Sequence, residues 1–205
     1  MSVLHIVNHI YNSMTYILPT GNHKDCWLVD CGDLDVIIEE GWHVIGVLIT
    51  HSHYDHIYGL NNLVLYFPNV SIYTNKEGKE GLLNPKLNFS KYHEEIGNFV
   101  FCKPENIHII EGEGEMQLPN GPFVEVLATP GHDSSCLTYK IGMNLFTGDA
   151  YIPGVKVFYK FPRGNKEQAL SSYEMLANMQ KKGFHIYCGH HTYRKTDFNK
   201  KEEYS

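Results

Sequence analysis

The stretch VIGVLITHSHYDHIYG, residues 44–59, joins an apolar, β-branched run to three histidines and an aspartate. The run has the composition of a buried strand, so we expect the polar cluster at the end of that strand. Alternation along an extended chain sends His51 and His53 to the same side, where they suit one cation. Asp55 and His56 are adjacent and diverge from that pair, so a second cation could use them. The stretch therefore predicts a metal site.

Three later segments offer further ligands, and each follows an expected strand. ATPGHDSSC contains His132, LFTGDA contains Asp149, and YCGHHT contains His190 or His191. Loops that gather at one edge of a sheet are where sites are commonly built, so these side chains are expected to join the first cluster. The isolated histidines elsewhere are interpreted as surface or hydrogen-bonded residues.

Composition excludes several classes of protein. The 205 residues are 42% hydrophobic and 20% charged, which is typical of an ordinary globular domain. The formal net charge of -6, with no basic stripe, argues against a nucleic-acid partner. No run is long enough to cross a membrane, no secretory leader is evident, and the five cysteines are scattered. We expect a cytoplasmic protein with reduced thiols and a small-molecule partner; whether it forms a homo-oligomer is left open.

The order of expected elements predicts one α/β (α+β) domain over residues 1–205, with two sheets packed face to face and helices outside. Expected helices are 33–41, 60–67 and a long one capped by Asn165 and closed by Gly183, with a short helix and a lid-like segment within 75–98. Leu170, Tyr173, Leu176 and Ala177 should form the apolar face of the long helix. Expected strands are 3–10, 14–20, 25–32, 44–50, 70–74, 107–111, 116–119, 123–129, 136–142, 144–149 and 184–189.

The combined motifs resemble the series found in the metallo-β-lactamase superfamily. The matching pieces are THSHYDH (50–56), Pro130-Gly131-His132, Thr147-Gly148-Asp149 and Gly189-His190, and residues 30–32 are similar to the family's D-x-G turn. The resemblance implies a four-layer αββα sandwich with its site at one edge of the two sheets. It also implies the ligand sets, which are His51, His53 and His132 for one metal, Asp55, His56 and His190 for the other, and Asp149 as the bridge.

Within that superfamily, Cys188-Gly189-His190 followed by Thr192 and Tyr193 is similar to a segment of the glyoxalase II (hydroxyacylglutathione hydrolase) branch, with the order of Tyr and Thr changed. That branch carries a C-terminal helical region that helps to bind glutathione, and this chain stops soon after its last ligand. The resemblance therefore implies thioester hydrolysis without implying glutathione as the substrate.

The ligand set predicts a metal-dependent hydrolase. Two divalent cations, zinc by first choice with iron or manganese as alternatives, would activate a bridging hydroxide that Asp55 orients. That hydroxide would cleave a small thioester, lactone or related acyl substrate. An alternative is a mononuclear iron oxidoreductase like the persulfide dioxygenases, using His51, His132 and Asp149. A nuclease is disfavoured by the acidic charge balance, and a non-catalytic metal-binding module would have been indicated by missing ligands.

Substrate contacts are sought in the segment 151–166, which directly follows Asp149. Tyr151, Lys156 and Tyr159 are the candidates there, and Tyr193 is added from the last motif. The same segment could equally be a solvated basic loop.

Overall fold

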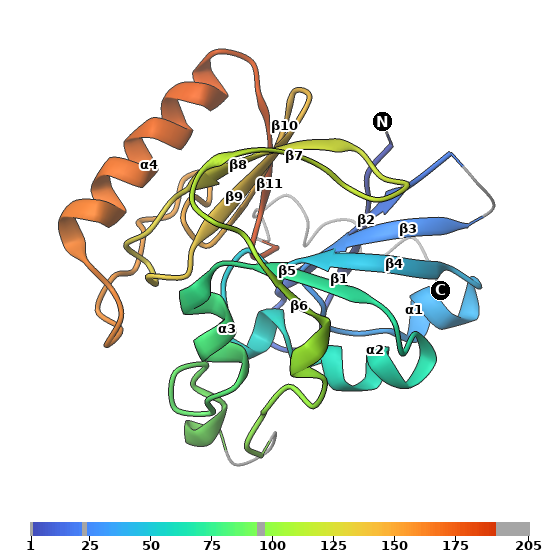
Figure 1. Cartoon of the computed structure of the whole chain (residues 1–205). Helices are drawn as coiled ribbons and strands as arrows, with labels where there is room; N and C mark the ends of the chain where they lie inside the picture. Colours follow the sequence, from blue (N-terminus) through green and yellow to red (C-terminus); the bar gives the residue numbers. More distant parts are fainter. Residues whose placement is uncertain (1, 22–23, 94–96, 192–205) are drawn as a thin grey trace, which may run out of the picture.

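The computed structural model describes residues 2–21, 24–93 and 97–191, and it folds them into two β-sheets that face each other, with helices on the outer faces (Figure 1). The expected four-layer α/β sandwich is therefore confirmed. Within the described residues, no helix is both long and apolar enough to cross a membrane.

The first sheet has six strands in the sequential order β1-β2-β3-β4-β5-β6. Its strands are β1 (Leu4–Val7), β2 (Met14–Pro19), β3 (Asp25–Val29), β4 (His43–Leu48), β5 (Ser71–Thr74) and β6 (Ile107–Ile109). The first three are antiparallel, whereas β3 to β6 run parallel. Parallel neighbours need crossover connections, which here carry the helices.

The second sheet has five strands in the order β11-β10-β9-β8-β7. They are β7 (Gly114–Gln117), β8 (Phe123–Ala128), β9 (Leu137–Ile141), β10 (Asn144–Gly148) and β11 (His185–Cys188). All neighbours are antiparallel except β10 and β11. Strand β7 begins and ends two residues before its expected bounds, because Leu118 already belongs to a turn, in which its carbonyl accepts from the Gly121 N–H at 3.0 Å.

Four α-helices lie outside the sheets, with α1, α2 and α3 on the outer side of the first sheet and α4 across the second (Figure 1). They are α1 (Asp35–Glu39), α2 (Leu60–Tyr66), α3 (Lys76–Leu82) and α4 (Lys166–Lys181), and single 3-10 turns cover Tyr54–His56, Ser90–Tyr92 and Pro104–Asn106. The Asn165 side chain accepts a hydrogen bond from the Gln168 N–H, which confirms the expected cap of α4. Leu170 was expected in the buried face but is 46% exposed, since it faces the segment 156–160 rather than the sheet.

Three apolar cores correspond to the three interfaces of the sandwich. Between the sheets, Trp27 and Leu48 of the first pack with Tyr139 and Phe146 of the second. The core under α1 and α2 and the core under α4 fill the two outer interfaces. The central strands β2, β3, β9 and β10 are buried on both faces, as the apolar runs of the sequence indicate, whereas β1 and β7 at the sheet edges are mostly exposed.

Hydrogen bonds to backbone carbonyls connect the two sheets at the edge where β4 ends. The Leu137 N–H donates to the Thr50 carbonyl and the Tyr139 hydroxyl to the Ile49 carbonyl, both at 2.8 Å. Nearby, Ser13 pairs with His190 in an isolated bridge, and the Met14 N–H donates to the Gly189 carbonyl at 2.8 Å. This edge gathers the ends of β4, β8, β10 and β11.

Candidate metal centre

Five imidazoles and two carboxylates meet at this edge of the sandwich. The turn after β4 supplies His51, His53, Asp55 and His56, the β8–β9 loop supplies His132, and the ends of β10 and β11 supply Asp149 and His190. Five of the seven residues are no more than 6% exposed. The structure therefore brings together every ligand that the sequence predicts, from both sheets.

The first group contains His51, His53 and His132, each of which offers one ring nitrogen within 4.8 Å of those of the other two. His53 Nδ1 is 3.1 Å from His132 Nε2. The second group contains Asp55, His56 and His190. In that group, the two Nε2 atoms are 3.4 Å apart, and Asp55 Oδ2 is 3.5 Å from one and 3.4 Å from the other.

The carboxylate of Asp149 lies between the two groups. Its Oδ2 is 3.5 Å from His132 Nε2 in the first group and 3.2 Å from His190 Nε2 in the second, and its Oδ1 is 3.6 Å from His56 Nε2. A Cβ on Gly189 would come within 2.1 Å of Asp149 Oδ1, so only glycine leaves room for this carboxylate. The position suits a bridge between two cations.

Hydrogen bonds behind the rings set the tautomers of four imidazoles. The Nδ1–H groups of His132 and His190 donate to the carbonyls of Phe158 and Tyr11, at 2.8 and 3.0 Å. That of His56 donates to Asp30 at 2.8 Å. Because the Thr50 hydroxyl gives its own proton to Asp30 at 2.7 Å, it accepts from the Nδ1–H of His51 at 3.1 Å. We assign the Nε2 lone pairs of all four rings to the centre on this basis.

Asp30 is a functional residue whose role the sequence did not reveal. Its Oδ1 also accepts from the Thr50 N–H at 2.7 Å, and its backbone has φ +58. The D-x-G turn marked Asp30 in the sequence, but Asp30 lies 26 positions before His56, whose ring it orients, so the sequence did not show this contact. Its carboxylate sits behind His51 and His56 and holds the strand end in place.

Burial and neighbouring charges shift the pKa values of the groups in this centre in different directions. Burial, together with neighbouring histidines, holds the pKa of His51 well below its usual value, so this imidazole stays neutral. Burial would raise the pKa of Asp149, but His56, His190 and His132 outweigh it and hold that pKa well below its usual range. Burial would lower the pKa of His56, but Asp55, Asp149 and Asp30 outweigh it and raise that pKa. The negative charge of these three carboxylates favours a cation beside His56.

The chemistry of these side chains fits a metal centre. With the tautomers assigned above, the Nε2 lone pairs of His56 and His190 face each other at 3.4 Å, an arrangement that is unfavourable unless positive charge lies between them. His51 Nε2 and Asp149 Oδ1 are buried without a hydrogen-bond partner in the described part of the chain. Imidazole and carboxylate together suit zinc, iron or manganese.

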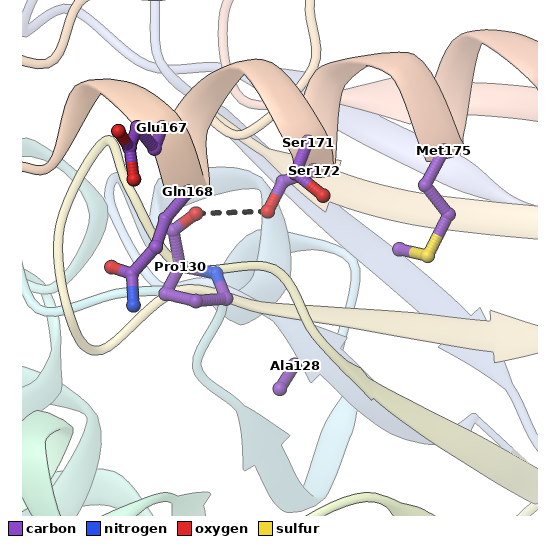
Figure 2. A pocket seen from close by; sticks show the side chains of 7 residues that line it. All are labelled: Ala128, Pro130, Glu167, Gln168, Ser171, Ser172 and Met175. Atoms are coloured by element: carbon purple, nitrogen blue, oxygen red, sulfur yellow. Dashed lines mark hydrogen bonds between the residues drawn. The ribbon is translucent and has the colours of Figure 1, made fainter.

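Helix α4 fixes the loop that carries His132. The Ser172 hydroxyl donates to the Pro130 carbonyl at 2.8 Å, as Figure 2 shows, and the Asn165 N–H donates to the Gly131 carbonyl at the same distance. Gly131 has φ +126, and a Cβ there would lie 2.0 Å from the backbone nitrogen of Ala169. The glycine thus allows the chain to pass against the helix immediately before the histidine.

A cavity of about 360 Å³ opens over the centre. Its walls beyond the predicted ligands are aromatic, and they are Tyr11, Tyr54, Phe89, His93 and Phe161. Phe89 and Phe161 pack against each other with a tilt of 35°, and both meet the His53 ring edge to face, with ring centroids 4.8–4.9 Å apart. The sequence did not single out these residues, because they come from separate loops and share no motif.

The three predicted substrate residues that the structure describes do not line this cavity. Tyr151 is buried beneath α4, where its hydroxyl donates to Gln180 Oε1 at 2.5 Å. Lys156 and Tyr159 line a neighbouring pocket of about 550 Å³ with Leu170 and Tyr173. Tyr193, like Thr192, lies outside the described residues.

Comparison with known proteins gives the family. The profile of the metallo-beta-lactamase superfamily matches residues 15–190, which include every residue of the centre. The chain therefore belongs to the metallo-beta-lactamase superfamily.

The curated relatives are named as hydrolases. The chain is 33% identical over 139 residues to a probable metallo-hydrolase of Bacillus subtilis (strain 168), covering 66% of this chain and 63% of that one. It is 28% identical over 181 residues to a hydroxyacylglutathione hydrolase of Pseudoalteromonas translucida (strain TAC 125), covering 85% and 59%. The chain thus spans about three fifths of the length of these two relatives.

Solved structures share the fold at low sequence identity. BLEG-1 B3 metallo-beta-lactamase superposes with a TM-score of 0.78 at 21% identity, covering 93% of this chain and 92% of that one. TTHA1623, whose structure is of a di-iron-bound form, gives 0.73 at 20% identity with 92% of both chains covered. ETHE1 from Myxococcus xanthus gives 0.64 at 20% identity, covering 94% and 76%.

Proposed function

We propose that the protein is a cytoplasmic, dinuclear metal-dependent hydrolase of small acyl substrates, with a thioester or a lactone as the preferred class. The observation that supports this most directly is the position of Asp149. One carboxylate lies 3.5 Å from a nitrogen of the first ligand group and 3.2 Å from a nitrogen of the second, as a shared ligand would. Relatives named hydroxyacylglutathione hydrolase support the thioester class.

Zinc is the proposed cation, because a site of five imidazoles and two carboxylates offers the nitrogen and oxygen ligands that zinc prefers. Iron and manganese remain alternatives with the same ligands. His51, His53 and His132 would hold one cation, Asp55, His56 and His190 the other, and Asp149 both. Such a pair supplies an activated water at neutral pH and polarises a carbonyl oxygen.

The protein's own side chains would position the reactants. Asp55 lines the cavity at the floor, and its carboxylate can accept a hydrogen bond from the attacking water and orient it toward the substrate carbonyl. Phe89 and Phe161 cover one side and limit access of bulk water. No cysteine or serine lines the described walls of the cavity, so a protein nucleophile has no part in this scheme.

The walls also limit the substrate. A cavity of about 360 Å³ accepts a small group, and its described lining contains no lysine or arginine. We therefore propose that the acyl part that enters is small and uncharged. Lys156 and Lys160 flank the neighbouring pocket, where they could receive an anionic part that extends beyond the centre.

A mononuclear iron oxidoreductase using His51, His132 and Asp149 is the second candidate, and the likeness to ETHE1 is its support. The position of His53 argues against this candidate, because its Nδ1 lies 3.1 Å from His132 Nε2 and could bind the same metal as a third imidazole. A two-histidine, one-carboxylate iron site needs open coordination positions, and a third histidine ligand would occupy one of them.

The test is the number and identity of metals per chain, by elemental analysis of protein purified without chelator, followed by a screen of thioesters and lactones. Two zinc ions per chain and hydrolysis of a small acyl substrate are expected. His190→Gln should lose one metal equivalent, whereas His185→Gln, at the exposed start of the strand that precedes His190, should keep both. About one iron per chain with oxygen uptake would replace this proposal with the second candidate.

A further inference from the structure

A buried carboxylate outside the ligand set lies directly behind the first group. Asp133 is fully buried, and its Oδ1 accepts from the Ser135 N–H at 2.8 Å and from the Ser135 hydroxyl at 2.6 Å. The same oxygen is 3.0 Å from Nη2 of Arg163. Its Oδ2 makes no hydrogen bond within the described residues and lies 3.6 Å from Nε2 of His53.

His53 is the one imidazole of the centre whose outer nitrogen lacks a close partner. The other four have an oxygen at 2.8–3.1 Å behind the ring. His53 also enters the centre differently, because its Nδ1 rather than its Nε2 faces His132. With a metal on Nδ1, the proton of the neutral ring is on Nε2, and this nitrogen is buried and makes no hydrogen bond in the described chain. A buried N–H without a partner is costly, and Asp133 Oδ2 is the acceptor that it faces.

We propose that Asp133, held in place by Arg163, is the positioning residue for His53, fixing its tautomer and aiming its Nδ1 at the first metal. This inference rests on the proposed metal centre. It gives each half of the centre a carboxylate behind a histidine, with Asp30 behind His56 and Asp133 behind His53. Such carboxylate–histidine pairs orient ligands and raise their basicity.

Arg163 connects this pair to two other parts of the molecule. Its Nε donates to the Ser134 hydroxyl at 2.9 Å, and its Nη2 donates to the carbonyl of Glu77 in α3 at 3.0 Å. It also lies two residues after Phe161, which packs on the His53 ring. One guanidinium thus joins the aromatic wall, helix α3 and the first ligand group, and its planar fork makes lysine a poor replacement.

The experiment is a cobalt(II) titration of metal-free protein, followed by absorption spectroscopy, for wild type, Asp133→Asn and Arg163→Gln. Wild type should bind two equivalents. Asp133→Asn should bind one equivalent as wild type does and the other about 10–100-fold more weakly, with a changed cobalt spectrum. Arg163→Gln should show the same defect in the same equivalent. Asp25→Asn, which removes an exposed carboxylate 2.8 Å from the His43 ring, is the matched control and should leave both equivalents unchanged.

The outcomes separate this inference from the function on which it rests. If wild type fails to bind two equivalents, the dinuclear centre itself is wrong. If wild type binds two and both variants bind two with unchanged affinity and spectrum, Asp133 does not position His53. Equal weakening of both equivalents, with a matching loss of stability in the metal-free protein, would show a merely structural role and overturn the inference. Arg163→Gln keeps the test valid should Asp133→Asn fail to fold.

Discussion

The carboxylate of Asp149 contacts side chains of both ligand groups, so its loss should affect both metals. Asp149→Ala is expected to weaken both by more than the roughly 10–100-fold typical of a change behind the ligands, and to reduce turnover to background. Metal analysis after dialysis and kcat on the best substrate measure this. Glu125→Ala, which changes a residue of β8 outside the ligand set, is the control. If Asp149→Ala binds two metals tightly and keeps full turnover, the dinuclear mechanism is wrong.

Asp33 gives a pH-dependent contribution to stability. Its carboxylate accepts from the Tyr58 hydroxyl at 2.6 Å and from the His9 N–H at 2.8 Å. Burial would raise the pKa of Asp33, but the bonds from Tyr58 and His9 outweigh it and hold that pKa below its usual value. A lowered pKa in the folded state stabilises the protein above the unfolded-state pKa of about 3.9, and this stabilisation is lost as the pH falls through the folded-state pKa.

Asp33→Asn should therefore lower the free energy of unfolding by about 1 kcal/mol at pH 7, and the difference should shrink as the pH falls below about 4. Urea unfolding at a series of pH values measures it, with the exposed Glu39→Gln as control. A difference that grows toward acid pH would contradict the sign worked out here.

The ligand residues were predictable because they follow strands and lie in short motifs. The residues that orient the ligands from behind were not predictable. His51 and His53 are two positions apart, and alternation alone relates them. Asp133 and His53 are 80 positions apart, and only the folded chain shows that the two atoms face each other. Tyr151 shows the converse: it lies only two residues after Asp149, yet its ring turns to α4, where it packs edge to face on the partly buried ring of Tyr173.

The contact of α4 with the β8–β9 loop leads to a prediction about Gly131. An added Cβ would clash with the helix backbone and also strain a residue at φ +126. Gly131→Ala is expected to lower the free energy of unfolding by about 3 kcal/mol and to weaken the metal held by His132. Gly154→Ala is the matched control, since Gly154 has φ +79 and nothing within 4 Å of an added Cβ.

Backbone strain alone should cost the control about 1 kcal/mol and leave metal binding intact. Thermal unfolding and metal analysis of the two variants together distinguish strain from displacement of the loop. Equal losses in both variants would mean that the packing of α4 against Gly131 does not position His132.

The types of most elements followed from periodicity and turn residues. The β-branched runs predicted the inner strands, and Asn165 with Gln168 predicted the start of α4. Pairing did not follow, because the sequence does not show that β3 to β6 are parallel or that β11 joins β10. Leu170 was assigned to the wrong surface since helical spacing places it beside Tyr173 and Leu176 but cannot show which neighbour covers that part of the stripe.

The centre draws ligands from both sheets, so bound metal should hold the sandwich together. His51 and His53 follow a strand of the first sheet, whereas Asp149 and His190 follow strands of the second. A cation present at 1,000 times its Kd stabilises the folded state by about 4 kcal/mol. At about 2–4 °C per kcal/mol, chelation should lower Tm by roughly 8–16 °C.

Calorimetry with and without a chelator measures this shift. His190→Gln should show a smaller shift than His185→Gln, which retains the full set of ligands. An unchanged Tm on chelation would mean that the two sheets do not share a metal.

The bridge between Ser13 and His190 also bears on how the protein is made. The ring of His190 donates to the carbonyl of Tyr11, a residue 179 positions earlier, so the second ligand group depends on a contact between the two ends of the folded region. Contacts of such sequence separation carry a large loop-closure cost and are expected to form late. A ribosome-bound chain that has emerged only through β9 would already contain five of the seven predicted ligands. It would still lack Asp149 and His190, so hydrolytic competence should arise only after the last strand has docked.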